Sequence, residues 1–344
     1  MTIRIAINGF GRIGRMILRA FLEARQKDPN SYKDLEFVAI NDLGNVETNA
    51  HLFKYDSIHG PFQGSVEVKD GSLQVDGLLI KTLAVASPSQ LPWESLKIDI
   101  VFECSGRFTE RSKAEEHLKA GAQKVLISSP AEGADITIVY GVNQNNLKST
   151  DQIISNASCT TNCLAPVAFV LNNHIGIERG YMTTIHAFTG DQSLVDSIHK
   201  DLRRARAATL SMIPSTTGAA RAVGLVLPEL KGKLDGTAIR VPVSNVSLVD
   251  LTFIAKRPTS PEEINNIMIK ASQEQSLKGI LNVSNLPLVS TDFNHSSASA
   301  TFDTTQTQVV ENTLCRVLAW YDNEWGFSNR MLDTSIAIGK TLQN

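Results

Sequence analysis

Apolar and polar residues alternate along the first half of the chain in a pattern that predicts strands separated by helices. The apolar runs, rich in β-branched residues, lie at residues 3–8, 36–41, 98–103 and 124–128. After the first run, Ile13, Ile17 and Phe21 recur at helical spacing, and residues 110–120 form a second helical segment. Strands that alternate with helices favour a parallel sheet with crossover helices, the α/β arrangement.

The pattern changes after about residue 150. Residues 159–173 predict a single helix, and the strand-like runs that follow are longer, at residues 180–187, 237–243, 246–256 and 315–321. Long strands with few intervening helices favour an α+β domain built on a mostly antiparallel sheet. We therefore expect two domains, residues 1–158 and 159–325, with a C-terminal helix within 326–344 that packs back on the first domain. Residues 329–341 look amphipathic.

Composition narrows the class of protein. The 344 residues are 42% hydrophobic and 20% charged, with a formal net charge of −2. This balance gives no reason to expect nucleic acid or a membrane as the primary partner. Four cysteines are too few for a disulfide framework, the first residues enter a strand without a signal peptide, and no apolar run approaches the roughly 20 residues that span a bilayer. We expect a cytoplasmic protein.

A glycine-rich turn links the first strand to the first helix. Gly9, Gly11 and Gly14 match G-x-G-x-x-G, in which the first glycine permits a tight turn, the second lets a pyrophosphate approach and the third lets the helix lie close to the strand. Asp42 follows the second strand, where an acid binds the adenosine ribose and repels a 2′-phosphate. The pattern indicates a Rossmann dinucleotide domain that binds NAD; a βα turn without ligand is the alternative.

Cys159 lies where a helix is predicted to start, within Ser-Asn-Ala-Ser-Cys-Thr-Thr-Asn-Cys. A helix N-terminus stabilises a thiolate, as does a nearby imidazole. Cys163 follows one turn later and is expected to be buried and structural. No second ligand pair at suitable spacing accompanies the two cysteines, so we predict no metal site. An inert core cysteine is the alternative, which the surrounding Ser, Thr and Asn residues disfavour.

His186 is the candidate base, because it ends a predicted strand and opens into a loop. A core histidine bonded to backbone is the alternative, but a thiol nucleophile needs such a base. The basic stretch 199–206 could be a solvated face, yet one or two of its arginines could bind an anion. Thr216, Thr217 and Gly218 enter a predicted helix, which also suits an anion. Arg240 lies inside a predicted strand, where a substrate phosphate could pair with it.

These motifs resemble one family. The N-terminal Ala-Ile-Asn-Gly-Phe-Gly-Arg-Ile-Gly-Arg, the segment around Cys159 and Trp320-Tyr-Asp-Asn-Glu-Trp-Gly are similar to phosphorylating, NAD-dependent glyceraldehyde-3-phosphate dehydrogenases of bacterial type, over essentially the whole chain. The resemblance implies a homotetramer of glycolysis or gluconeogenesis, with an N-terminal dinucleotide domain and a C-terminal catalytic domain. It implies that glyceraldehyde 3-phosphate, NAD and inorganic phosphate react through a thioester on Cys159.

The resemblance also implies a role for individual residues. Cys159 resembles the nucleophile and His186 its base, with the Cys159 N–H stabilising an oxyanion. The cofactor contacts carried over, besides the three glycines, are Arg12, Ile13, Asp42, Ser128 and Asn323. Thr189 and Arg240 correspond to the site for the substrate's phosphate, and Arg204 lies between that site and a second one. The residues carried over to that second site, for inorganic phosphate, are Ser158, Thr160, Thr217 and Gly218.

Two positions depart from the family pattern. Ser197-Ile198 replaces the usual Leu-Pro, and a small polar residue there occurs in forms that accept NADP. Asp42 favours NAD nonetheless, because a carboxylate repels the phosphate dianion. Phe327 replaces a usual Tyr, which removes one hydrogen bond near the nicotinamide.

Other functions are open to the same residues. Erythrose-4-phosphate dehydrogenase shares the cysteine motif, but that sister family tends to lose the threonines at positions equivalent to Thr189 and 216–217, which this chain keeps. A cysteine-dependent acyl transferase or hydrolase would use Cys159 and His186 without nicotinamide, and the glycine turn with Asp42 argues against it. A nucleotide- or RNA-binding role is secondary at most, given the balanced charge.

Overall fold

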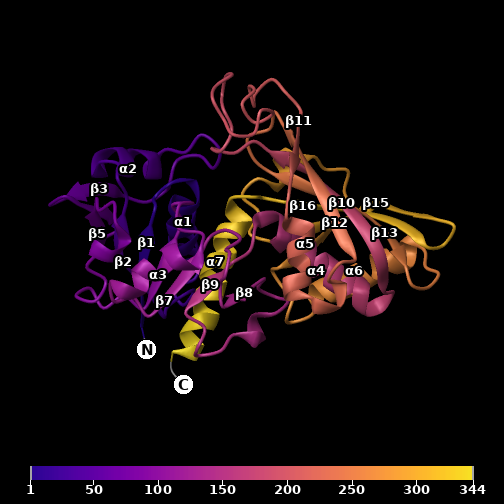
Figure 1. Cartoon of the computed structure of the whole chain (residues 1–344), viewed down its shortest axis with the longest axis horizontal. Coiled ribbons are helices and arrows are strands. Elements are labelled where there is room, and N and C mark those ends of the chain that lie inside the picture. Colours follow the sequence, from indigo (N-terminus) through magenta and orange to yellow (C-terminus); the bar gives the residue numbers. More distant parts are fainter. Residues whose placement is uncertain (1, 343–344) are drawn as a thin grey trace. The chain divides into compact units, whose positions relative to one another are not determined.

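The computed structural model describes residues 2–342, which form two compact units (Figure 1). The N-terminal unit comprises residues 2–138, 144–157 and 328–342, and the C-terminal unit comprises residues 139–143 and 158–327. The chain thus visits the second unit briefly at residues 139–143, enters it again at residue 158 and returns to the first unit at residue 328.

The N-terminal unit is built on a nine-stranded sheet with the order β3-β4-β5-β2-β1-β6-β7-β9-β8. Its strands are β1 (Ile3–Asn8), β2 (Leu35–Asn41), β3 (Val66–Lys69), β4 (Ser72–Val75), β5 (Leu78–Leu83), β6 (Ile100–Glu103), β7 (Lys124–Ile127), β8 (Ile136–Thr137) and β9 (Ile153–Ser155). Its other elements are α1 (Arg12–Lys27), α2 (Val46–Lys54), α3 (Arg111–Lys119), η1 (Pro88–Gln90) and η2 (Gln144–Asn146). The pairs among β5, β2, β1, β6, β7, β9 and β8 are parallel.

The strand order reverses at β1, which lies between β2 and β6. In such sheets the carboxyl ends of the strands at this reversal form the ligand crevice. Three buried side chains join these ends: Asn41 Nδ2 donates to Asn8 Oδ1 at 2.7 Å, and Asn8 Nδ2 donates to Glu103 Oε2 at 2.6 Å. The network fixes the spacing of β2, β1 and β6 where a ligand would lie.

A short antiparallel meander at one edge of this sheet was not predicted from the pattern. β3, β4 and β5 pair through two tight turns, each with an Asp-Gly sequence at positive φ: Asp70 (49°) with Gly71 (69°), and Asp76 (47°) with Gly77 (80°). Asp-Gly between short strands is a strong local signal for such turns. The signal was in the sequence, but β3 and β4 are only four residues long and mix apolar with polar positions, so they did not stand out.

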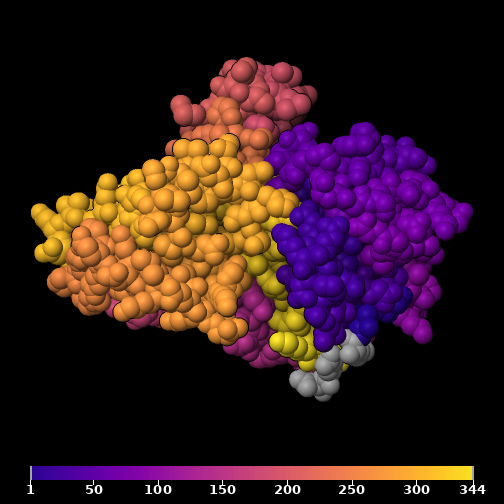
Figure 2. Space-filling model, turned by 180° about the vertical axis from the view of Figure 1, so that it is seen from behind, coloured from indigo at the N-terminus to yellow at the C-terminus, as the bar shows by residue number. Residues whose placement is uncertain are grey.

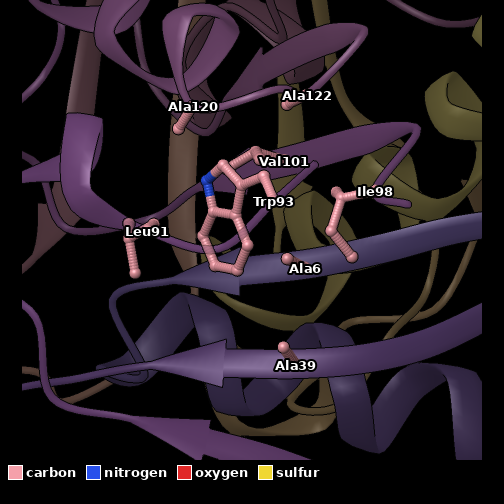
Figure 3. Packing of buried hydrophobic residues seen from close by; sticks show 8 residues of the cluster. All are labelled: Ala6, Ala39, Leu91, Trp93, Ile98, Val101, Ala120 and Ala122. Carbon is pink, nitrogen blue, oxygen red and sulfur yellow. The ribbon is translucent and has the colours of Figure 1, made fainter. Parts of the chain in front are cut away.

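Trp93 is the largest fully buried side chain of the N-terminal unit and shows how its sheet is covered (Figure 3). The indole lies against Ala6 on β1, Ala39 on β2 and Val101 on β6, where alanines leave room for it. Its Nε1 donates to His117 Nδ1 at 3.0 Å. Because Trp can only donate, the His117 proton lies on Nε2, which faces Glu103 Oε2 at 2.9 Å. The indole therefore links the apolar core to the polar network at the strand ends.

The C-terminal unit is built on a seven-stranded sheet with the order β11-β12-β10-β13-β16-β15-β14. Its strands are β10 (Ile177–Ala187), β11 (Ile213–Thr216), β12 (Leu234–Val241), β13 (Ser247–Ala255), β14 (Leu281–Ser284), β15 (Ala300–Val310) and β16 (Leu314–Tyr321). Its other elements are α4 (Cys159–His174), α5 (Ala219–Val226), α6 (Pro261–Gln273), η3 (Pro228–Leu230) and η4 (Ser290–Phe293). Only β10–β12 and β14–β15 pair in parallel, so the prediction of an α/β domain followed by a mostly antiparallel α+β domain is confirmed.

The last helix, α7 (Trp325–Thr341), begins before residue 329, the start of the stretch that looked amphipathic, and most of its residues are buried. Asp322 starts it: one carboxylate oxygen accepts from the N–H groups of Glu324 (2.9 Å) and Trp325 (2.7 Å). Several polar residues of this helix, including Thr334, are buried. Thr334 Oγ1 donates to Asn156 Oδ1 at 2.7 Å, which shows how a helix buried on nearly all sides can keep polar side chains.

Replacing Trp93 by Phe should destabilise the protein. Trp93→Phe leaves a small void and removes the hydrogen bond that the indole makes to the buried His117. We expect a loss of about 2 kcal/mol, seen as a thermal midpoint lower by roughly 4–8 °C. Differential scanning calorimetry measures it, with Leu91→Ala, an apolar truncation in the same cluster, as the reference. An unchanged midpoint for Trp93→Phe would show that this packing contributes little.

Candidate active site

Cys159 is the first residue of α4, and local structure holds it there. Ser158 is the N-cap: its Oγ accepts from Thr161 N at 3.0 Å. The preceding residue, Ala157, has a φ of +57°, a left-handed conformation that costs an ordinary residue about 1–2 kcal/mol. The helix therefore begins abruptly at Cys159, whose side chain remains half-buried, while Cys163 one turn later is fully buried as expected.

His186 faces Cys159 across the end of the sheet. Its Nε2 lies 3.5 Å from Cys159 Sγ, within hydrogen-bonding distance for sulfur. The imidazole is 5% exposed, near the end of β10. Burial, and then the positive charge of Arg240, lower the pKa of His186 to about 3, so the ring is neutral at physiological pH. The two residues that the sequence paired are together in space, although 27 positions separate them.

The electrostatics of the thiol differ from the expectation of a stabilised thiolate. Burial raises the pKa of Cys159, while the positive charge of Arg240 and hydrogen bonds from Thr160 act in the opposite direction. Burial is the largest of these influences, and the neutral imidazole of His186 adds no positive charge beside the thiol. The resting pair is therefore a thiol beside a neutral imidazole, in which Nε2 can take the proton when Sγ attacks.

Tyr321, which the sequence did not single out, ties the two halves of this pair together. Its buried hydroxyl lies 2.8 Å from Thr160 Oγ1 on α4 and 2.8 Å from Thr184 Oγ1 on β10. Its ring packs edge-on against the His186 ring, with 5.9 Å between centroids. One side chain from β16 thus fixes both the helix that carries Cys159 and the strand that carries His186.

Arg240 lies beside His186 because β10 and β12 pair in parallel with these two residues in register. Its Nη1 is 2.9 Å from His186 Nδ1 and 3.0 Å from Ala187 O. Its Nε is buried without a hydrogen-bond partner, and no carboxylate among residues 2–342 forms an ion pair with it. Arg240 is half-buried, and a partly desolvated cation with a buried, unsatisfied donor suits an anionic ligand.

The loop that follows β10 carries the other cation of the predicted site. Arg204 Nε and Nη2 donate to Ser215 Oγ at 2.9 and 2.7 Å, and Nη1 pairs with Asp191. Protein groups therefore hold Arg204 in place. His199, in the same loop, is half-buried, and its Nδ1 accepts a hydrogen bond from Asp201 N. The loop, residues 188–212, contains neither helix nor strand and projects from the rest of its unit (Figure 2).

The remaining residues expected around the substrate have the following surroundings. Thr217 Oγ1 accepts from Ala219 N at 3.1 Å, and Gly218, the N-cap residue of α5, is exposed. Thr160 is buried and held by Tyr321. Half-buried Thr189 donates from its N–H to Gln192 Oε1 at 3.4 Å. The amide Nε2 of Gln192 is a buried donor without a partner, a further group that a ligand could satisfy.

The glycine-rich turn in the N-terminal unit has the geometry that its sequence requires. Gly9 has a φ of +93°, and a Cβ on it would lie 2.5 Å from Ser105 N. A Cβ on Gly14 would lie 2.3 Å from Gly9 O, so the helix could not approach the strand with a larger residue. Gly11 has nothing within 4 Å of its Cβ position, which leaves its backbone open to a phosphate. The main-chain donors of Arg12 and Ile13 follow directly, at the start of α1.

A pocket of about 260 Å³ opens beside this turn, with Gly9, Gly11, Asn41, Asp42, Cys104 and Ser105 among its lining residues. Asp42 also has a structural role, because its carboxylate accepts from Phe10 N at 2.7 Å and from Gly44 N at 2.8 Å. The Arg12 side chain pairs with buried Asp56. Ser128, after β7, bonds through its side chain to Cys104.

Asn323 belongs to the C-terminal unit and follows β16. Its Oδ1 accepts from Ser247 Oγ at 2.8 Å, and the same Ser247 hydroxyl accepts from Ala187 N at 3.1 Å. With its oxygen occupied, Asn323 has an amide NH₂ to offer a ligand. Ser247 thereby connects Asn323 to the segment that carries His186.

Comparison with known proteins gives consistent matches. Residues 3–111 match "Glyceraldehyde 3-phosphate dehydrogenase, NAD binding domain", and residues 158–323 match the C-terminal domain of the same family. A glyceraldehyde-3-phosphate dehydrogenase of Xanthobacter flavus is 61% identical over 340 residues, 99% of each chain. That of Cereibacter sphaeroides is 56% identical over 342 residues, 99% of this chain and 100% of the relative. This chain belongs to the glyceraldehyde-3-phosphate dehydrogenase family.

The resemblance inferred from the motifs is thus confirmed. The glyceraldehyde-3-phosphate dehydrogenase family comprises NAD-dependent oxidoreductases that act on an aldehyde. Tyr321, Ser247 and Gln192 contact predicted site residues or the segments that carry them, and the sequence reasoning did not single them out. Tyr321 stands in the Trp-Tyr-Asp-Asn-Glu-Trp-Gly motif, which carried a usable signal, whereas Ser247 has none in its own neighbourhood.

Removing the N-cap of α4 should lower the stability of the protein and also slow the reaction of the Cys159 thiol with an alkylating reagent. Ser158→Ala removes an N-cap bond worth about 1 kcal/mol. Ser260→Ala removes the equivalent cap of α6, where Ser260 Oγ accepts from Glu263 N at 3.2 Å. We expect similar decreases in thermal midpoint, but slower alkylation of Cys159 by iodoacetamide only in Ser158→Ala. Equal alkylation rates in the two variants would mean that the cap does not position the thiol.

The stability of the protein should depend on His186 in acid. Because its folded pKa is about 3, the unfolded chain binds a proton at His186 below about pH 6.5 while the folded chain does not. The stability that neutral His186 confers is therefore complete above that pH and is lost as the pH falls toward 3. Relative to His186→Asn, the wild type should lose thermal stability between about pH 7 and 4. Exposed His174→Asn, at the end of α4, is the control, and a pH-independent difference for His186→Asn contradicts the prediction.

Proposed function

We propose that this chain catalyses the phosphorylating oxidation of D-glyceraldehyde 3-phosphate to 1,3-bisphosphoglycerate with NAD and inorganic phosphate, in glycolysis or gluconeogenesis. The contact between Cys159 and His186 is the observation that carries the proposal, because it joins a nucleophile to a base at the start of a helix. Full-length similarity to proteins named glyceraldehyde-3-phosphate dehydrogenase supports it.

The first half of the reaction uses the thiol and the imidazole. Cys159 Sγ attacks the aldehyde carbon, and the thiol proton passes through His186 Nε2 to the carbonyl oxygen, which gives a hemithioacetal. The N–H of Cys159 is available to stabilise the transient oxyanion. His186 Nε2 then accepts the hydroxyl proton as the carbon loses a hydride, and a thioester on Cys159 remains.

The second half needs an anion beside the thioester. Inorganic phosphate attacks the thioester carbon, and the carbon–sulfur bond breaks to release the acyl phosphate and the Cys159 thiolate, which recovers its proton. We propose Arg240 and Thr189 as ligands of the substrate's own phosphate, since Arg240 is a half-buried cation whose Nε is a buried donor without a partner. For inorganic phosphate we propose Ser158, Thr160, Thr217 and Gly218, with Arg204 between the two sites.

The N-terminal unit has the features that a dinucleotide needs. The positive φ of Gly9, the open backbone at Gly11 and the pocket beside Asp42 fit the pyrophosphate and ribose of NAD. NAD, when bound, accepts the hydride. We propose that Arg12 and Ile13 donate backbone N–H groups, that Ser128 borders the cofactor and that Asn323 orients the carboxamide. The division into an NAD-binding domain (1–158) and a catalytic domain (159–325), with the last helix on the former, belongs to this proposal.

We also propose a cytoplasmic homotetramer. The loop of residues 188–212 exposes a set of large apolar side chains that a monomer would leave in water: Leu194, Val195, Ile198, Leu202, Leu210 and Met212. Exposed apolar patches of this kind mark protein interfaces. Within residues 2–342, no helix combines the length and apolar character needed to cross a membrane.

Initial rates test the proposal. NADH formation from glyceraldehyde 3-phosphate should require phosphate. The rate with NAD should exceed the rate with NADP, and kcat/KM should be higher for glyceraldehyde 3-phosphate than for erythrose 4-phosphate. Cys159→Ser should reduce the rate to background, and His186→Asn should lower kcat by roughly 10²–10⁴-fold, the usual contribution of a general base.

Each alternative predicts a different result. Turnover without phosphate would exclude the phosphorylating reaction, and preference for erythrose 4-phosphate would reassign the substrate. Absence of NAD binding by calorimetry would favour a cysteine-dependent hydrolase or acyl transferase. Analytical ultracentrifugation at micromolar concentration tests the tetramer, which a sedimenting monomer or dimer would overturn.

A further inference from the structure

Glu103 is a buried carboxylate that the proposed reaction does not use. It is the last residue of β6 and is 1% exposed. Within residues 2–342, neither a lysine nor an arginine forms an ion pair with it. A buried carboxylate is costly unless hydrogen-bond donors replace its hydration. The groups around Glu103 must therefore account for its place in the fold.

Four donors converge on this carboxylate. Oε1 accepts from Ser105 N at 2.8 Å and from Ser105 Oγ, while Oε2 accepts from Asn8 Nδ2 at 2.6 Å and from His117 Nε2 at 2.9 Å. The His117 proton lies on Nε2 because Nδ1 accepts from Trp93. A protonated carboxyl would add a donor of its own, so this set of partners requires the ionised form.

The donors belong to the walls of the pocket of about 260 Å³ beside the glycine-rich turn. Asn8 and Ser105 both line it. Asn8 Oδ1 accepts from Asn41 Nδ2 at 2.7 Å. Asn41 in turn donates to Val85 O at 2.9 Å and accepts from Val85 N at 2.8 Å. Asn41 and Val85 line the same pocket, so Glu103 is the end of a hydrogen-bonded chain that runs across its wall.

Ser105 also holds the loop after β6 against the glycine-rich turn. A Cβ on Gly9 would lie 2.5 Å from Ser105 N, so the two backbones are in contact. Ser105 Oγ accepts from Arg107 N at 3.2 Å, and Arg107 lines the pocket as well. Loss of the bonds to Glu103 would release this loop from the turn that is expected to receive the pyrophosphate.

A neutral side chain of the same shape cannot replace the carboxylate. A glutamine would offer one acceptor oxygen and one NH₂ group. With its oxygen toward Asn8 and His117, its NH₂ would meet the Ser105 N–H, which cannot turn away. With the amide reversed, the NH₂ would meet the donors of Asn8 and His117. His117 cannot move its proton to Nδ1, because Trp93 donates there.

We propose that Glu103 is a positioning residue for the dinucleotide. Its carboxylate draws together donors from β1, from α3 and from the loop after β6, and so forms the pocket before a ligand arrives. Such preorganisation lowers the cost of binding. Glu103 acts on the adenosine and pyrophosphate part of the cofactor and not on the chemistry at Cys159. This inference rests on the proposed binding of NAD beside the glycine-rich turn.

ADP-ribose is the probe, because it carries the adenosine and the pyrophosphate but no nicotinamide. By calorimetry, Glu103→Gln should bind it roughly tenfold or more weakly than the wild type. Asp99→Asn is the matched control. Asp99 is 6% exposed and precedes the same strand at its other end, where it accepts from Arg4 N at 2.8 Å and Gln123 Nε2 at 2.6 Å.

Both variants should have a lower thermal midpoint, but the control should keep the wild-type Kd. An unchanged Kd for Glu103→Gln, or an equal loss of affinity in Asp99→Asn, overturns the inference. Steady-state rates give a second readout. In Glu103→Gln, KM for NAD should rise while kcat at saturating NAD changes by less than about twofold, because only binding is weakened. A lower kcat with an unchanged KM contradicts the proposal.

Hydrogen–deuterium exchange of the wild type tests the inference even if Glu103→Gln fails to fold. The N–H groups of Ser105 and Arg107 are bonded in the ligand-free chain, so peptides that span residues 103–108 should exchange slowly without ADP-ribose. Fast exchange that becomes slow only with ADP-ribose would show that the ligand, and not Glu103, forms this wall. A wild type that binds neither ADP-ribose nor NAD would refute the proposed function instead.

Discussion

The register between β10 and β12 is the constraint on which the catalytic unit depends. These strands pair in parallel with His186 opposite Arg240, so the two side chains lie on the same face of the sheet. A slip of one residue would turn every side chain of one strand to the other face and separate the cation from the imidazole. That single pairing brings the half-buried Arg240 guanidinium against His186, where its positive charge adds to the effect of burial in lowering the pKa of the imidazole.

Cys159 is positioned beside His186 by a second set of interactions, which does not depend on the pairing of β10 with β12. The left-handed Ala157 and the Ser158 cap start α4 abruptly, so that Cys159 stands at its first turn. Tyr321 then connects α4 to β10 through two threonine hydroxyls. The distance between sulfur and imidazole is thus set by groups from three parts of the chain. Because these hydrogen bonds are buried, the arrangement is rigid, which suits a site where small displacements reduce the rate.

The N-terminal unit applies the same logic to the cofactor. The polar ends of β1, β2 and β6 are joined through Asn8, and Trp93 anchors that network in the apolar core through His117. The Asp42 carboxylate ties the glycine turn to the end of β2. Asp42, expected to bind the adenosine ribose and to favour NAD, therefore also shapes the turn that would receive the pyrophosphate.

The sequence by itself determined those features whose causes are local. The apolar periodicities predicted both fold classes, the glycines at 9, 11 and 14 predicted the turn for a dinucleotide, and the polar residues around Cys159 predicted the start of a helix. The Asp-Gly turns could have predicted the β3–β5 meander. The sequence did not predict how fully α7 is buried, because residues 329–341 look amphipathic, whereas most residues of the helix are covered in the fold. Only the tertiary structure decided that Arg240 contacts His186, that Tyr321 bridges Thr160 and Thr184, and that burial offsets the helix start at Cys159. Such contacts depend on strand register and desolvation, which arise when distant segments pack together and leave no local trace.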